Sequence, residues 1–135
     1  MSFAFGKTSL ERLGTCDPRL EDVARRALET SPMDFGIACG HRGKEDQEKA
    51  VAEGKSKVHW PNGKHNAVPS KAFDFFPVVN GKADWDDIKK FKTIALHILK
   101  TGEAMGVKLR WGGDWNCNCI EDDNWYDRPH IELKE

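Results

Sequence analysis

The sequence contains no long hydrophobic run and no internal repeat. Its longest apolar candidate, around residues 94–99, is interrupted by His97 and flanked by lysines, whereas a helix needs ~18–20 apolar residues to span a bilayer. We therefore expect no membrane span and no stable membrane association. Residues 1–10 hold neither a continuous apolar stretch nor a small-residue cleavage site, so we also expect no secretory signal and an initial location in the cytoplasm.

An excess of charge of either sign is also missing. The 135 residues include 21 Lys and Arg against 22 Asp and Glu. A protein held on nucleic acid needs a clustered excess of basic residues, so the balance argues against a nucleic-acid partner. The 39% of hydrophobic residues can form a core, since a chain of this length buries about two thirds of its unfolded surface. We predict one domain over residues 1–135.

Cysteine is scarce, and the four cysteines do not form an obvious disulfide framework. The expected cytoplasmic location keeps thiols reduced. Cys117 and Cys119 are separated by one residue, which suits neither a relaxed mutual disulfide nor the two-residue spacer of many zinc sites. We expect free cysteines without a metal role, and the sequence assigns no function to Cys117 or Cys119.

Hydrophobic periodicity predicts helices that alternate with short strands. The clearest helix begins at Asp17-Pro18, a capping carboxylate and a first-turn proline, ahead of apolar residues three and four apart. Such interleaving predicts an α+β fold, with a small, mostly antiparallel sheet packed with about three helices. Residues 55–70 show neither the helical period of about 3.6 residues nor the strand period of two. We expect a loop there, and a loop of this length usually has a function. We expect helices over residues 17–31, 44–53 and 84–102, and strands over residues 35–39, 72–77, 107–111 and 131–133.

One acidic residue interrupts a predicted apolar strand. Asp74 lies between Phe73 and Phe75 in the strand over residues 72–77. A buried carboxylate needs a cation, a metal ion or several hydrogen-bond donors, because burial of an unpaired charge is costly. Strand alternation equally allows Asp74 to point to solvent while the two phenylalanines face the core. The strand pattern alone leaves both interpretations open.

Two histidines lie close to predicted strands. His65 precedes the strand that contains Asp74, and His130 comes directly before the last strand. Each histidine alone is an ordinary structural residue. Together with Asp74, they supply two imidazoles and one carboxylate, which are the three protein ligands of a catalytic Zn²⁺ site whose fourth position holds water. His65, Asp74 and His130 are therefore candidate ligands of a zinc site.

Two further residues have candidate roles in catalysis. Asp127 lies three residues before His130, so a turn at Pro129 would bring its carboxylate near the metal as a general base. An exposed acid paired with Arg128 is the alternative. Arg42 follows the predicted strand over residues 35–39. At the end of a strand, its guanidinium could bind a substrate carboxylate or an oxyanion. The alternative is an arginine exposed to solvent.

The order of these residues forms a wider pattern. Its segments are Gly40-His41-Arg42 with Gln47, Lys64-His65, Ser70-Lys71-Ala72-Phe73-Asp74-Phe75-Phe76-Pro77, and Tyr126-Asp127-Arg128-Pro129-His130-Ile131-Glu132-Leu133. This pattern resembles the VanY-type zinc peptidases, in a group that includes lysostaphin, D-alanyl-D-alanine peptidases and hedgehog domains. Residues 1–7 and 109–115 resemble more closely the phage L-alanyl-D-glutamate endopeptidases. The similarity spans nearly the whole chain.

The resemblance implies a hedgehog-like fold and a role for each candidate residue. His65, Asp74 and His130 would bind zinc, Asp127 would be the catalytic base, and Arg42 would contact the substrate or transition state. The implied activity is that of a phage endolysin, which hydrolyses the bond between L-alanine and D-glutamate in peptidoglycan stem peptides. The family places six residues between the first histidine and the aspartate, whereas eight lie here, and Gly63 replaces the usual serine.

The resemblance also implies how such an enzyme reaches its substrate. We expect a monomer that accumulates in the host cytoplasm and reaches the periplasm and cell wall after a separate holin-type protein permeabilises the membrane. Two other functions remain open, a D-alanyl-D-alanine carboxypeptidase or dipeptidase, and a non-catalytic zinc-stabilised cell-wall binding module. Glu121, Asp122 and Asp123 are candidate ligands for a second, hard cation.

Overall fold

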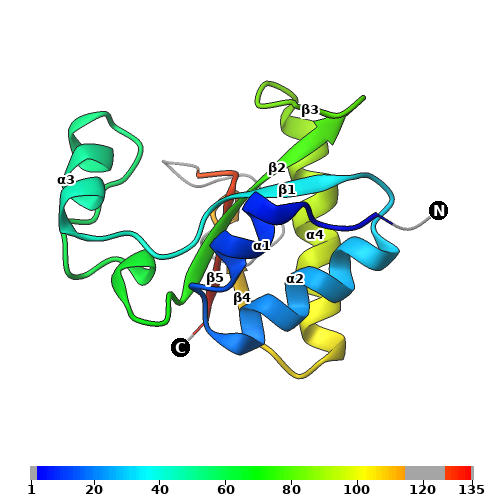
Figure 1. Cartoon of the computed structure of the whole chain (residues 1–135), viewed down its shortest axis with the longest axis horizontal. Coiled ribbons are helices and arrows are strands. Elements are labelled where there is room, and N and C mark those ends of the chain that lie inside the picture. Colours follow the sequence, from blue (N-terminus) through cyan, green and yellow to red (C-terminus); the bar gives the residue numbers. More distant parts are fainter. Residues whose placement is uncertain (1–2, 115–126, 135) are drawn as a thin grey trace.

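Helices alternate with strands along most of the chain in the computed structural model, which describes residues 3–114 and 127–134 (Figure 1). The predictions for Cys117, Cys119 and the second cation site lie outside these residues. The elements are α1 (Lys7–Leu13), α2 (Pro18–Thr30), β1 (Phe35–Cys39), α3 (Lys44–Ala52), the 3-10 helix η1 (Lys64–Asn66), β2 (Ala72–Val79), β3 (Lys82–Ala83), α4 (Ile88–Ala104), β4 (Leu109–Trp111) and β5 (His130–Leu133).

The strands form one antiparallel sheet in the order β1-β2-β5-β4, and β3 pairs with the end of β2. The β2–β3 hairpin turns at Asn80 (φ 53°) and Gly81 (φ 77°), the pair of positive φ angles that a two-residue loop of type I′ requires. The α+β class and the antiparallel sheet that the sequence predicts are confirmed. Four α-helices and η1 surround the described sheet, where about three helices were expected.

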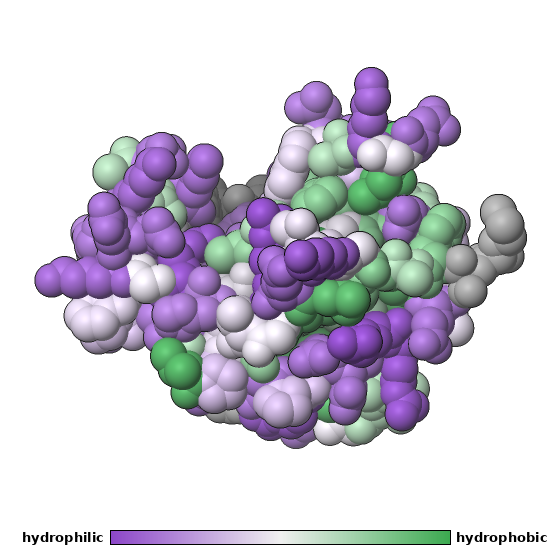
Figure 2. Space-filling model, viewed as in Figure 1, coloured by the Kyte–Doolittle hydropathy of each residue, from purple (hydrophilic) through white to green (hydrophobic). Residues whose placement is uncertain are grey.

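One face of the sheet carries the hydrophobic core. Phe73 and Phe75 of β2 and Ile131 of β5 are fully buried there, and α2 and α4 contribute their apolar sides to the same cluster. In Figure 1, α3 and the loop after it lie on the other side of the sheet from α2 and α4. Figure 2 shows mainly hydrophilic residues over α3. The sheet therefore separates the core from a polar region.

The tertiary structure decides between the two interpretations of Asp74. Because Phe73 and Phe75 face the core, Asp74 lies on the opposite face of β2. This face is not open solvent, since the Asp74 side chain keeps only 15% of its exposure. His130 lies on the same face of the sheet, because it pairs directly with Asp74 across β2 and β5. Both polar residues thus belong to the polar side of the sheet.

Local hydrogen bonds explain where the helix prediction differs from the structure. α4 begins at Ile88 and not at residue 84, because the Asp87 carboxylate caps the helix by accepting from the Lys89 and Lys90 backbone N–H groups. The Asp84 N–H donates to the Pro77 carbonyl and extends the hairpin. α1 and β3 are absent from the prediction, because α1 buries only Leu13 and β3 has two residues.

Cys16 and Cys39 are free thiols, as predicted for them. Among the residues that the structure describes, no helix is long and apolar enough to cross a membrane.

Candidate metal centre

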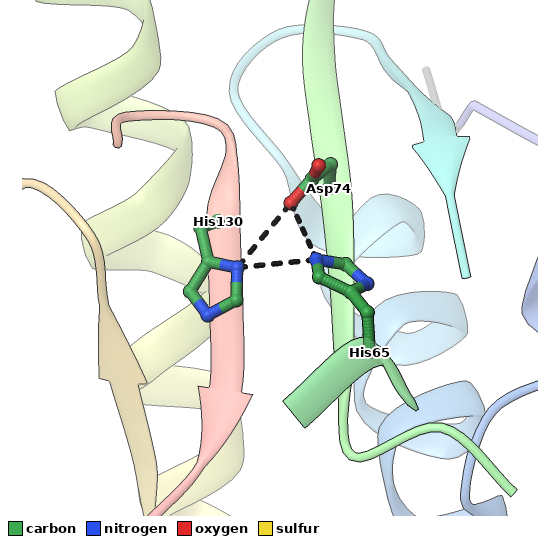
Figure 3. Close-up of side chains that lie close together, drawn as sticks. All are labelled: His65, Asp74 and His130. Atoms are coloured by element: carbon green, nitrogen blue, oxygen red, sulfur yellow. Dashed lines mark hydrogen bonds and ion pairs between the residues drawn. The ribbon is translucent and has the colours of Figure 1, made fainter. Parts of the chain in front are cut away.

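His65 is aimed at the polar face of the sheet by η1 and by one backbone contact. Its Nδ1 lies 2.8 Å from the Gly40 carbonyl oxygen, which can only accept, so Nδ1 carries the proton of the neutral ring. The other nitrogen, Nε2, then presents a lone pair to Asp74 and His130 (Figure 3). His65 is 4% exposed, so this orientation is set by its surroundings.

Asp74 and His130 reach the same point from neighbouring strands. His65 Nε2, Asp74 Oδ1 and His130 Nδ1 converge, as Figure 3 shows, and the three atoms lie within 4.8 Å of one another. Their separations are 3.1 Å for His65 to Asp74, 3.2 Å for His65 to His130 and 3.4 Å for His130 to Asp74. The structure thus brings together the three residues that the sequence predicted as ligands.

These separations fit a metal ion. In a tetrahedral site with metal–ligand bonds of about 2.0–2.1 Å, ligand atoms lie about 3.3–3.4 Å apart. Two imidazole nitrogens and one carboxylate oxygen are also ligands that suit zinc and other first-row transition metals. His65, Asp74 and His130 can therefore hold a metal ion with little movement.

The three groups perturb one another strongly. Burial acts to lower the pKa of His65, but the adjacent Asp74 carboxylate outweighs it and raises that pKa to about 10. Burial acts to raise the pKa of Asp74, but His65 and His130 outweigh it and hold that pKa well below its usual range. The pKa of His130 is raised, because hydrogen bonds to carboxylates outweigh its burial. Without a metal ion, His65 therefore favours its protonated form at pH 7.

Binding of zinc to the apoprotein at pH 7 is expected to release at least about one proton, because a protonated imidazole cannot bind a metal. The pKa of His65, raised to about 10, lies above this pH, so the proton must leave. Zinc affinity should accordingly rise as the pH rises from 6 to 8. Isothermal titration calorimetry in two buffers of different ionisation enthalpy measures the number of protons. Identical heats in the two buffers would contradict this expectation.

Asp127 approaches the same group through a turn. The His130 N–H donates to the Asp127 carbonyl oxygen at 3.0 Å, which closes the turn that the sequence required at Pro129. Asp127 Oδ2 then lies 4.0 Å from His130 Nδ1. Burial, with a further contribution from Asp74, raises the pKa of Asp127 to about 6 against the opposing histidines and Arg42. Asp127 is thus not an exposed loop acid, and its pKa suits a general base.

Arg42 reaches the site, but its contacts are to the protein. Its Nη2 donates to Asp74 Oδ2 at 3.3 Å, and its Nη1 donates to Gln47 Oε1 at 3.2 Å. Gln47 is 1% exposed, and it also accepts a hydrogen bond from Asn66, which follows His65. Arg42 therefore supports the oxygen of Asp74 that faces away from the two histidines. Its contact with substrate stays a prediction.

A cavity of about 570 Å³ opens beside these groups. Arg42, Asp74 and Asp127 line it together with Trp85, which the sequence analysis did not single out. Trp85 is 51% exposed and packs on Phe76, with 5.2 Å between ring centroids. Phe76 lies two residues after Asp74, so strand alternation places both on the same face of β2. This spacing could have predicted an aromatic wall beside Asp74. A second cavity, of about 410 Å³, lies between α4 and β4 away from the site.

Fold and site together define an α+β protein whose antiparallel sheet brings two histidines and an aspartate together, with the aspartate in the wall of a cleft, as in a catalytic metal site. The family model for the phage L-alanyl-D-glutamate peptidases matches residues 1–134. The chain belongs to this family.

Individual proteins agree with this assignment. The L-alanyl-D-glutamate peptidase of Escherichia phage T5 is 41% identical over 137 residues, which cover 98% of this chain and 99% of that protein. The crystal structure of the Serratia marcescens L-Ala D-Glu endopeptidase ChiX matches with a TM-score of 0.80 and 26% identity. That match covers 98% of this chain and 91% of the Serratia chain. The fold is therefore shared with an endopeptidase of this specificity.

Proposed function

We propose that this protein is a zinc-dependent peptidoglycan endopeptidase, a phage endolysin that hydrolyses the bond between L-alanine and D-glutamate. The observation that carries the proposal is the convergence of His65, Asp74 and His130, with Asp127 beside them, next to a cleft that Asp74 and Asp127 line. The membership of the phage L-alanyl-D-glutamate peptidase family supports the choice of bond. Two imidazoles and one carboxylate support zinc as the metal.

The residues of the chain divide the work of the reaction. His65, Asp74 and His130 would hold zinc, which when bound supplies a Lewis acid that polarises the scissile carbonyl and lowers the pKa of a water molecule. Asp127 Oδ2 accepts a proton from the attacking water in the cleft and donates it to the leaving nitrogen of D-glutamate. Arg42 holds Asp74 in place, and its guanidinium lines the cleft where substrate binds.

Digestion of purified muropeptides tests the proposed bond. The zinc-loaded protein is expected to separate L-alanine from D-glutamate, which mass spectrometry detects as an N-acetylmuramoyl-L-alanine product and a shortened peptide. Release of a terminal D-alanine would instead indicate a carboxypeptidase. Zinc-loaded protein that binds cell walls without cleaving them would indicate a binding module.

Removal of the metal should abolish lysis and leave the fold intact. The core lies on the opposite face of the sheet from the candidate metal centre, so Phe73, Phe75 and Ile131 stay buried without the ion. A chelator is expected to lower the melting temperature, because the bound metal stabilises only the folded state, and to preserve the far-UV circular dichroism spectrum at 25 °C. Added zinc should restore lysis. Loss of the folded spectrum on chelation would show a structural metal site.

We further propose that the protein acts as a monomer, and that it reaches the wall from the host cytoplasm only after a separate holin-type protein permeabilises the membrane. The phage origin in the description of its family supports this proposal. Cells that express the protein alone should keep their optical density, whereas cells that also express a holin should lyse. Rapid lysis by the protein alone would contradict this route.

A further inference from the structure

A buried glutamate lies behind one of the three candidate ligands. Glu132 Oε1 is 2.8 Å from His130 Nε2, and both side chains are 9% exposed. The other ring nitrogen, Nδ1, faces His65 Nε2 and Asp74 Oδ1 (Figure 3). The two nitrogens of His130 therefore have different partners, Glu132 on one side and the candidate metal centre on the other.

The strand places Glu132 in this position. His130 and Glu132 are two residues apart in β5, so both project from the face opposite to Ile131. Burial of a carboxylate is costly unless cations or donors compensate it. Besides His130, the cations near Glu132 are the ammonium of Lys64 and the guanidinium of Arg110, its cross-strand neighbour in β4, which lies 3.9 Å away. The short contact of Glu132 is thus the one with His130.

This contact selects one tautomer of the neutral imidazole. A carboxylate accepts hydrogen bonds, so Nε2 of His130 must carry the proton and donate it to Glu132. Nδ1 is then left with a lone pair that points to the candidate metal centre. His65 shows the reverse arrangement, since its Nδ1 donates to the neutral Gly40 carbonyl and its Nε2 faces the centre. The acceptor behind His130 is thus a carboxylate, whereas the acceptor behind His65 is a neutral carbonyl.

We propose that Glu132 is a positioning residue for the metal centre. Its carboxylate holds His130 in the tautomer that presents Nδ1 to the metal, and its negative charge makes that imidazole a more basic ligand. Carboxylates that hydrogen-bond to metal-binding histidines have these two effects in other metal sites. The inference rests on the proposed function only in so far as that function requires a metal bound to His130.

The test compares zinc affinity in the full-length protein with Glu132→Gln, Glu132→Met and Arg110→Met, by competition with a chromophoric chelator. Glu132→Met removes both acceptor and charge and should raise the zinc Kd about 10- to 100-fold. Glu132→Gln keeps an acceptor but loses the charge, and its Kd should rise by at least about fivefold. Arg110→Met removes only the 3.9 Å ion pair and should leave the Kd within about twofold of wild type.

Nitrogen-15 NMR of the zinc-loaded proteins provides a readout that a merely structural role would not move. In wild type, the Nε2–H proton of His130 should be protected from exchange and shifted downfield by the carboxylate, whereas in Glu132→Gln it should move upfield. A Glu132→Gln protein with an unchanged Kd and an unchanged Nε2–H resonance overturns the proposal, whether or not Glu132→Met folds. Failure of wild type to bind zinc would instead refute the proposed function.

Discussion

Replacement of His65 with alanine is expected to lower the rate of cell-wall lysis at least about 1,000-fold, a loss of about 4 kcal/mol of transition-state stabilisation. His65 supplies one of the three converging ligand atoms, and the remaining aspartate and histidine cannot hold the metal in its catalytic geometry. Zinc content, measured by atomic absorption after dialysis, should fall well below one ion per chain. Muropeptide digestion followed by chromatography gives the rate.

The matched control is His59→Ala. The His59 side chain is 66% exposed and pairs with Glu48, and it belongs to no converging group of ligands in the described structure. This variant should keep full zinc content and activity within about twofold, because exposed ion pairs contribute little to stability. A His65→Ala protein that folds, binds one zinc ion and lyses cells as wild type does would remove His65 from the site.

Replacement of Asp127 with asparagine is expected to separate metal binding from catalysis. The amide has a similar shape but cannot accept the proton, so kcat should fall by about 100- to 10,000-fold. Zinc content should stay at one ion per chain, because Asp127 lies outside the group of His65, Asp74 and His130. The two quantities are measured on the same preparation, zinc by atomic absorption and kcat by muropeptide digestion.

Asp22→Asn provides the control for this change. Asp22 lies on the exposed side of α2, away from the residues that line the cleft, so the same chemical change should leave kcat unaltered. If Asp127→Asn lyses cell walls at the wild-type rate with zinc bound, another group takes the proton. Loss of zinc in this variant would instead make Asp127 a ligand.

The two predictions depend on a division of the sheet between stability and chemistry. In β2, Phe73 and Phe75 enter the core while Asp74, between them, enters the cleft. In β5, Ile131 lies in the core while His130 turns to the opposite face. Substitution of a ligand therefore removes no core side chain, and variants at the site are expected to fold.

Several helices and strands could be predicted from the local spacing of apolar residues and from helix caps. The cap and apolar spacing of α2 predict a helix after Asp17, and the helix runs over Pro18–Thr30. The strand predicted over residues 35–39 matches β1. The sequence analysis does not predict α1 and β3, because short elements depend on tertiary contacts more than on their own periodicity. It also places the first residue of α4 too early.

The sequence by itself determined which side chains were available and which face each would take. Alternation along β2 places Asp74 on the face opposite to Phe73 and Phe75. Two imidazoles and a carboxylate are residue types that indicate a metal centre. Only the tertiary structure decided that the candidates meet. Asp74 pairs with His130 through the antiparallel register of β2 and β5, and the Gly40 carbonyl turns His65 towards both. The Gly40–His65 contact joins residues 25 positions apart and the His65–His130 contact joins residues 65 positions apart, beyond the reach of any helix or strand period.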